Sequence, residues 1–283
     1  MLVKFWGVRG SIPVPGSATI KFGGNTACVE VRCGRDIIII DGGTGLRVMG
    51  LDLMRRGFAF NSKKGRGKGK VSILFSHMHW DHIQGFPFFG PAFIKGNKIN
   101  IYGFKHLNVD LQQTLTGQQK LPNYPVSIYE MGGDIEFIEL HEGNVIKINK
   151  AAVTAVRLNH PGGSFGYKIS YKGKNLIYAC DYEHFDGKDR KLLNFAKGSD
   201  AIIYDAQYTP EEYYGADGSS GKQGWGHSTW EKGIELSELA GIKRLILFHH
   251  GHSDEDMEKI EKEAKRRFKN TIAAYEGLEL KLR

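Results

Sequence analysis

The chain has 283 residues, 41% of them hydrophobic, and a formal net charge of +8. This length and composition fit one large globular domain or two small ones, and the positive charge suits an anionic substrate. No apolar run approaches the roughly 20 residues that cross a bilayer, and no signal peptide is evident, so we expect a cytoplasmic protein that binds no membrane.

One pattern recurs along the chain. A short apolar run that favours a β-strand ends in a residue that can bind a metal or carry a proton. Strands buried on both faces have continuous apolar sequences of this kind, and polar groups at their ends can converge on one rim of a sheet. In chain order, the runs and the residues that follow them are 37–40 with Asp41, 71–75 with His77, 152–158 with His160, 176–180 with Asp181, 201–204 with Asp205 and 245–248 with His249.

Two other segments stand out from this pattern. Residues 63–70 are rich in Lys and Arg, which is typical of a solvated loop but also suits attraction of a phosphate-bearing substrate. Residues from about 104 to 125 have the pattern of an insertion that carries one helix, either a lid or an ordinary surface excursion. Because no internal repeat or linker is evident, we expect a single domain over residues 1–283.

Helices are clearest near the carboxyl end. Ser228 and Glu231 form a capping-box pattern, so the sequence predicts a helix that starts there and ends near Ala240. Ser253 is expected to cap a second helix, whose apolar residues recur at helical spacing and whose last turns are basic. A final strand is expected within residues 271–282.

The segment 76–85, SHMHWDHIQG, carries the strongest chemical signal. Alternate residues of an extended chain share a face, so His77 and His79 can point the same way, while Asp81 and His82 can turn back towards them. Imidazole nitrogens and carboxylate oxygens are normal ligands of zinc and similar divalent ions. A single ion needs only three or four ligands, so this cluster, with the residues at the other strand ends, indicates two metals close together.

The run His77-Met78-His79-Trp80-Asp81-His82, followed by Gly85, resembles the signature of the metallo-β-lactamase fold superfamily, and residues 41–45 resemble its earlier Asp-Gly turn. The resemblance covers nearly the whole chain. It implies an α/β fold in which four layers form an αββα sandwich, with the metal site at one edge. It also implies two divalent ions, with zinc as the first candidate and manganese or iron as alternatives. One ion would be held by His77, His79 and His160 and the other by Asp81, His82 and His249, with Asp181 between them, while His250 and His252 stay open as alternatives to His249.

A finer resemblance links the chain to phosphodiesterases of that superfamily. Residues 159–167 are similar to the stretch around the third ligand in tRNase Z and in cyclic-phosphate phosphodiesterases, and Asp205 with His227 resembles an acid–histidine pair of tRNase Z. The resemblance implies that a hydroxide held between the metals attacks phosphorus at a centre that includes Asp81. His227 would protonate the leaving oxygen while Asp205 orients its ring. The chain has no obvious long Gly/Pro-rich arm, and Asp205 stands where tRNase Z has glutamate, which favours a small phosphodiester over tRNA.

We therefore expect a dinuclear metal-dependent hydrolase of a small anionic phosphodiester, such as a 3′,5′- or 2′,3′-cyclic nucleotide or a cyclic ribose phosphate. Asn25, Ser164 and His184 are candidates for contacts with phosphate or base, and each also fits a structural role. The alternatives are an RNA endonuclease like tRNase Z, a lactone or thioester hydrolase, and a nucleic-acid-binding protein without catalysis. We also expect a homodimer, because the relatives that the resemblance suggests often pair.

Overall fold

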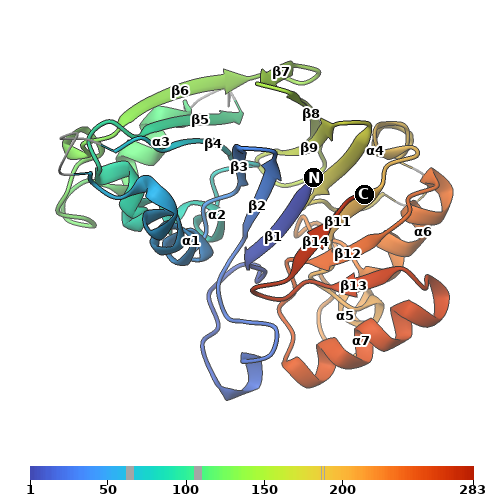
Figure 1. The fold of residues 1–283 in the computed structure, drawn as a ribbon. Coiled ribbons are helices and arrows are strands. Elements are labelled where there is room, and N and C mark those ends of the chain that lie inside the picture. The colour runs from blue at the N-terminus through green and yellow to red at the C-terminus, as the bar shows by residue number, and fades with distance from the viewer. Residues whose placement is uncertain (62–66, 105–109, 186, 188) are drawn as a thin grey trace.

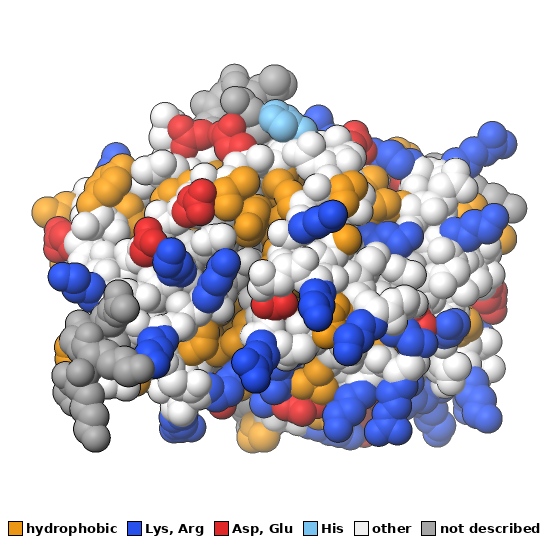
Figure 2. All heavy atoms as spheres, turned by 45° about the horizontal axis from the view of Figure 1, so that its top comes forward, with side chains coloured by type: hydrophobic (Ala, Val, Ile, Leu, Met, Phe, Trp, Pro, Cys, Tyr) orange, Lys and Arg blue, Asp and Glu red, His pale blue; other side chains and the backbone are white. Residues whose placement is uncertain are grey.

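The structure is a computed structural model that describes residues 1–61, 67–104, 110–185, 187 and 189–283. Part of the basic segment, 63–66, and part of the expected insertion, 105–109, lie outside the described residues. Within these ranges, none of the helices is both long enough and apolar enough to cross a bilayer. Figure 2 shows Lys and Arg side chains spread over much of one face, so the excess positive charge is not confined to one loop.

Two seven-stranded sheets form the centre of the molecule (Figure 1). The first sheet is antiparallel at one side and becomes parallel from β3 to β6. Its strands lie in the order β14 (Glu279–Lys281), β1 (Leu2–Gly7), β2 (Cys28–Cys33), β3 (Asp36–Ile40), β4 (Lys70–Leu74), β5 (Lys98–Phe104) and β6 (Asp134–Leu140).

The second sheet is also mixed. Strands β10 to β13 are parallel, and strands β7 to β10 are antiparallel. The order is β13 (Thr271–Ala273), β12 (Leu245–Phe248), β11 (Ala201–Asp205), β10 (Lys174–Ala179), β9 (Ser164–Tyr171), β8 (Ala151–Leu158) and β7 (Val145–Ile148).

The two sheets pack face to face over a buried apolar core to which both contribute, for example Phe5 from β1 and Phe248 from β12, whose ring centroids lie 5.9 Å apart. Helices α1 (Gly45–Leu53) and α3 (Leu111–Gln118) cover the outer face of the first sheet through a second apolar cluster. Helices α4 (Arg190–Ala196), α6 (Trp230–Ala240) and α7 (Asp254–Arg267) cover the second sheet through a third. The predicted αββα sandwich is confirmed.

The remaining helices are short. Helices α2 (Trp80–Ile83) and α5 (Pro210–Tyr214) follow strands β4 and β11 and lie near the rim of the sheets. Single 3₁₀ or π turns occur at Ser17–Thr19, Met54–Phe58, Phe86–Phe88, Gly90–Phe93 and Ile128–Glu130.

The predicted start of α6 is displaced by one residue. Thr229, not Ser228, is the N-cap, and its hydroxyl accepts from the backbone N–H of Lys232. The Ser228 hydroxyl is engaged elsewhere, 2.9 Å from the Tyr204 hydroxyl and 2.9 Å from His184 Nδ1. A tertiary contact has therefore taken the side chain that the local pattern assigned to capping. In α7, by contrast, Ser253 caps as predicted and accepts from Asp256 N–H.

The expected final strand is in fact two strands in different sheets. Strand β13 pairs in parallel with β12, and β14 pairs in antiparallel fashion with β1. The chain crosses between the sheets at Gly277, which has φ +88° and donates to the Phe5 carbonyl at 2.8 Å. A glycine tolerates this left-handed backbone, so the crossing needs only a few residues.

Candidate metal centre and catalytic site

Sharp turns at the carboxyl ends of three strands bring polar residues to one rim. Asp41, Asp181 and His249 follow β3, β10 and β12, and their φ angles are +60°, +54° and +62°. Left-handed backbone is unfavourable for residues other than glycine and is concentrated at functional sites. The three side chains are directed into one region between the sheets, where the segment 76–82 also lies.

Glycines pack the Asp41 turn against this segment. Gly42 N–H donates to the His82 carbonyl at 2.7 Å, and Gly85 N–H donates to the Gly42 carbonyl at 2.9 Å. A Cβ on Gly85 would lie 1.9 Å from the Gly43 carbonyl oxygen. The glycine that ends the motif is therefore required by close backbone approach.

Asp41 holds the start of the motif by hydrogen bonds. Its fully buried carboxylate accepts from Ser76 N–H at 2.7 Å, from the Ser76 hydroxyl at 2.9 Å and from the Tyr178 hydroxyl at 2.6 Å. His82 Nδ1 donates to the same carboxylate at 2.8 Å. These contacts occupy both oxygens, as expected for a residue that orients the loop.

The first group of candidate ligands consists of His77, His79 and His160 with Asp181, and the donor atoms all lie within 4.8 Å of one another. His79 Nδ1 lies 3.2 Å from His160 Nε2. Asp181 Oδ1 lies 3.6 Å from His77 Nε2 and 3.8 Å from His160 Nε2. Ligands placed about 2.0–2.2 Å from a shared zinc ion stand at separations of this size.

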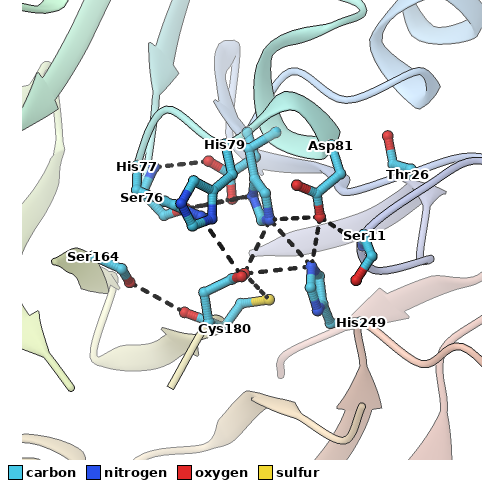
Figure 3. Close-up of polar contacts among 12 residues, drawn as sticks. Ser11, Thr26, Ser76, His77, His79, Asp81, Ser164, Cys180 and His249 are labelled. Carbon is cyan, nitrogen blue, oxygen red and sulfur yellow. Dashed lines mark hydrogen bonds and ion pairs between the residues drawn. The ribbon is translucent and has the colours of Figure 1, made fainter. Parts of the chain in front are cut away.

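The second group consists of Asp81, His82 and His249, all buried. His249 Nε2 lies 3.1 Å from His82 Nε2 and 3.0 Å from Asp81 Oδ2. The other oxygen of Asp181, Oδ2, lies 3.0 Å from His82 Nε2 and 3.4 Å from His249 Nε2. Asp181 thus presents one oxygen to each group, which is what a bridging carboxylate requires. Figure 3 shows Asp81 and His249 facing each other across this group, with His77 and His79 beside them.

The hydrogen bonds behind two of the rings, those of His77 and His160, direct nitrogen lone pairs into the site. The Ser76 hydroxyl gives its proton to Asp41, so its oxygen accepts from His77 Nδ1–H at 3.1 Å. The Gly226 carbonyl can only accept, so His160 carries its proton on Nδ1, 2.8 Å away. His77 Nε2 is buried and has no hydrogen-bond partner among the described residues. Metal-binding histidines are oriented in this way by outer partners, so the set fits divalent cations.

The electrostatics agree with this donor set. Burial lowers the pKa of His77 and of His160, which keeps both rings neutral and able to bind a metal. Burial also lowers the pKa of His82, but the carboxylates of Asp181, Asp81 and Asp41 outweigh burial and raise it above its ordinary value. The negative potential of these carboxylates, which favours a proton on the His82 ring, also favours a metal cation beside it.

His227 and Asp205 form a pair next to both groups. His227 Nδ1 lies 2.9 Å from Asp205 Oδ2 and 3.8 Å from Asp181 Oδ1, and its ring stacks on that of His249 with centroids 5.1 Å apart. Asp205 is fully buried and also accepts from the backbone N–H groups of Gln207 and Ser228. Burial by itself lowers the pKa of His227, but Asp205 reverses this and raises the pKa to about 9.

The structure also decides between neighbouring histidines. His250 Nε2 lies 3.0 Å from the Ala274 carbonyl, and His252 Nε2 lies 2.9 Å from Glu212 Oε2. Both rings thus make their contacts away from the two groups, and His249 alone of the three contributes to them.

The three candidate substrate-binding residues lie in different places. Asn25 donates its side-chain amide to Glu276 at 3.0 Å. Ser164 is buried, and its hydroxyl donates to the Cys180 carbonyl at 3.4 Å (Figure 3). His184 is buried beside Ser228 and borders a cleft that also includes His160. Of the three, only His184 lines a cleft next to the two groups of candidate ligands.

A comparison with known families identifies the family. The sequence pattern of a family described as a β-lactamase superfamily domain matches residues 37–250, which include both groups of candidate ligands. The chain belongs to the β-lactamase superfamily. Ribonuclease Z of Picrophilus torridus is 23% identical to it over 318 residues, which cover 98% of this chain and 94% of the relative.

Solved structures show the same fold. The metallo-β-lactamase fold protein YhfI of Bacillus subtilis superposes with a TM-score of 0.69 at 18% identity, over 99% of this chain and 98% of that one. A diphosphatase from the PhnP family superposes with a TM-score of 0.67 at 18% identity, over 100% and 98% of the two chains. These likenesses place the β-lactamase superfamily fold over the full length of the chain.

Two clefts of unlike character flank the β-lactamase superfamily site. One has a volume of about 410 Å³ and is bordered by His77 and His79, with a lining that is largely apolar. The other has a volume of about 510 Å³, is bordered by His160, and is lined by Glu183, His184 and other polar groups. The loop at Pro161 separates them, because it lines both.

Sequence reasoning missed Glu183, which anchors the Gly-rich loop before His227. This largely buried carboxylate accepts from Gly224 N–H at 2.6 Å, from Gly226 N–H at 2.8 Å and from the Tyr213 hydroxyl at 2.8 Å. The same Gly226 offers its carbonyl to His160, so one loop orients residues on both sides of the site. The acidic residue two positions after Asp181 was the available signal, but its partners are distant in the chain.

Ser11 and Gly10 are further contributors to which the sequence analysis assigned no role. Ser11 N–H donates to Asp81 Oδ2 at 2.8 Å (Figure 3). A Cβ on Gly10 would lie 2.4 Å from His249 Nδ1, so only a glycine leaves room for this ring. The amino-terminal loop therefore closes the second group from outside the sheets.

Proposed function

We propose that the chain is a dinuclear metal-dependent phosphodiesterase that hydrolyses a small phosphodiester, with cyclic nucleotides and cyclic ribose phosphates as the first candidates. The observation that carries this proposal is the Asp205–His227 pair, a proton donor placed beside both groups of ligands. A phosphodiester expels an alkoxide, which needs a proton more than most leaving groups of acyl transfer do. The relatives named ribonuclease Z support a metal-dependent hydrolase of phosphodiester bonds.

In this proposal, one divalent ion would be held by His77, His79 and His160. The other ion would be held by Asp81, His82 and His249, and Asp181 would contact both. When bound, such a pair supplies positive charge at the phosphoryl oxygens and lowers the pKa of water. Zinc suits this mixture of imidazole and carboxylate donors, which manganese and iron also accept.

The chain's own residues then position the proton. Because Nδ1 of His227 is engaged by Asp205, the ring presents Nε2 as the atom that can protonate the leaving oxygen. Asp205 is in turn oriented by backbone N–H groups, and it stabilises the imidazolium without needing to move. The polar loop anchored by Glu183 lies on the same side, so the leaving oxygen would face the polar cleft.

The second candidate is an RNA endonuclease, which the names of the curated relatives favour. The sequence has no obvious long Gly/Pro-rich arm, which favours the smaller substrate. A lactone or thioester hydrolase and a nucleic-acid-binding protein remain as outcomes of the test below. The homodimer stays a prediction, and the quaternary state can be measured by light scattering.

The test is hydrolysis of bis(p-nitrophenyl) phosphate, 3′,5′-cyclic AMP, 2′,3′-cyclic AMP and a precursor tRNA, with metal content measured and Asp81→Ala as control. We expect metal-dependent cleavage of a cyclic nucleotide and none of the tRNA. Cleavage of the tRNA alone would assign the protein to RNA processing. Two bound metals without any phosphodiesterase activity would direct the search to lactones and thioesters, and salt-sensitive RNA binding without turnover would favour the non-catalytic alternative.

A further inference from the structure

The apolar cleft is bordered by His77 and His79 of the first group of candidate ligands. Its other lining residues belong to neither group. Its wall is formed by Met78, Phe104, Leu111, Thr114 and Pro161, with Gly162 and Gly163 at one side. Apart from the two histidines, no ionisable side chain of the described residues lines it. A volume of about 410 Å³ is in the range of cavities that take up small organic groups.

The wall is held in place by packing. Leu111 is almost fully buried at the start of α3, where the Asp110 side chain accepts from Gln113 N–H and caps the helix. The Phe104 ring lies 4.7 Å from the Phe165 ring and 5.4 Å from the Arg157 guanidinium carbon. A cleft whose apolar wall is ordered before binding loses little entropy when a ligand enters.

Two of the lining residues, Gly162 and Gly163, carry no side chains. Gly162 and Gly163 have φ angles of +78° and +86°, which glycine adopts without strain. No heavy atom lies within 4 Å of the position that a Cβ on Gly162 would take. These two residues therefore add no bulk to the lining of the cleft next to Pro161.

The position of His227 indicates which part of the substrate would face the apolar cleft. His227 is held by Asp205 and directly follows Gly226, whose N–H donates to Glu183, a residue that lines the polar cleft. If His227 protonates the leaving oxygen, that oxygen lies on the same side, and the part of the substrate on the other side of phosphorus extends towards His77 and His79. The apolar cleft begins there.

The geometry points to the apolar cleft as the binding site of a planar apolar group of the substrate, a nucleobase or an aryl ring, on the side of phosphorus away from the leaving oxygen. In a cyclic nucleotide this group is the base of the single ribose that carries both ester oxygens, and in an acyclic diester it is the substituent that stays on phosphorus. This assignment rests on the proposed function. Burying a ring the size of a Phe side chain is worth about 1.5–3 kcal/mol, or roughly 10- to 100-fold in affinity. Residues 104 and 111–114 of the expected insertion would then determine specificity.

The kinetic test compares bis(p-nitrophenyl) phosphate with methyl p-nitrophenyl phosphate, which share a leaving group and differ only in the other substituent. We expect the wild-type protein to prefer the aryl diester by at least about tenfold in kcat/KM, mostly through KM. Thr114→Trp, which fills the cleft from α3, should abolish this preference, with the larger loss of kcat/KM on the aryl diester.

Gln112→Trp is the matched control, because Gln112 is exposed on the same helix and contacts the Tyr129 hydroxyl, away from the cleft. It should keep the wild-type preference. If Thr114→Trp retains the preference, or if the wild-type protein shows none, the assignment is wrong, whereas the proposed function stands because both substrates are hydrolysed.

Binding gives a readout that does not depend on turnover. In calorimetry, diphenyl phosphate should bind the wild-type protein at least about tenfold more tightly than dimethyl phosphate, with a more negative heat-capacity change. Thr114→Trp should bind both equally. A protein that turns over neither diester but discriminates in this way would refute the proposed function and retain the apolar site. Equal binding of both ligands to the wild-type protein would refute the site.

Discussion

The two groups of candidate ligands differ in how they are enclosed. The first includes the exposed His79 and opens onto the apolar cleft. The second is buried on all sides, with Asp41 behind His82, Ser11 on Asp81 and Gly10 against His249. The first group is thus placed to meet a substrate, while the second is stiffened by the protein around it. Changes in the second group should affect metal retention first, and changes beside the first should affect substrate preference.

The largest effect is expected where the groups join. Asp181→Ala removes the carboxylate that faces both, so bound metal should fall from two ions to one or none. Turnover should fall by more than about 100-fold, since even outer partners of metal ligands contribute 10- to 100-fold. Metal analysis of the purified protein with steady-state kinetics provides the measurement. Asp217→Ala, at an exposed loop position, is the control and should resemble the wild-type protein.

Next in size is His227→Ala, which tests a residue that belongs to neither group. Both ions should be retained, and turnover should fall by about 10²- to 10⁴-fold, the usual contribution of a general acid. The loss should grow with the pKa of the leaving alcohol, because a good leaving group needs no proton. A loss of equal size for p-nitrophenol and for alkyl alcohols would rule out the acid role.

Gly10→Ala should weaken metal binding by the second group and leave the first group unchanged. The added Cβ would lie 2.4 Å from His249 Nδ1 and 2.2 Å from Gln207 Oε1, so the ring must shift. We expect affinity for one ion of the pair to fall about 10- to 100-fold, as when an outer partner of a ligand is lost. Competition with a chelator measures it. Gly16→Ala, where a Cβ meets no atom within 4 Å, should change nothing. Equal losses of both ions from Gly10→Ala would show that the groups are not independent.

The smallest effect on function is expected from a change to Tyr178, which lies behind the second group of candidate ligands and donates to Asp41. Tyr178→Phe removes one of the donors to Asp41 and should lower the free energy of unfolding by about 1–3 kcal/mol, the cost of leaving a buried charged group short of a partner. Metal content and turnover should change little, because Ser76 and His82 still bind Asp41. Thermal unfolding of the metal-free protein measures the difference, with the exposed Tyr129→Phe as control. No change in unfolding would mean that the Tyr178 contact does not stabilise the turn.

Much of the site was evident from local sequence. The apolar run 71–75 followed by His77, His79, Asp81 and His82 predicts a strand that ends in ligands, because alternation along a strand and a tight turn are local properties of the chain. The cap of α7 at Ser253 was predicted for the same reason, since capping depends on residues three positions apart. The resemblance to a known family then indicated the order of the distant ligands and the four layers.

Tertiary structure decided what depends on contacts between distant segments. Ser228 packs against Tyr204 instead of capping α6, and the carboxyl end divides between two sheets at Gly277. It also selected His249 over His250, aimed the two oxygens of Asp181 at different groups, and placed α3 beside the segment 77–79 to form the apolar cleft. The sequence determined which chemical groups stand at the strand ends, because that follows from short-range patterns. Their mutual distances follow from how two sheets pack, which no short segment encodes.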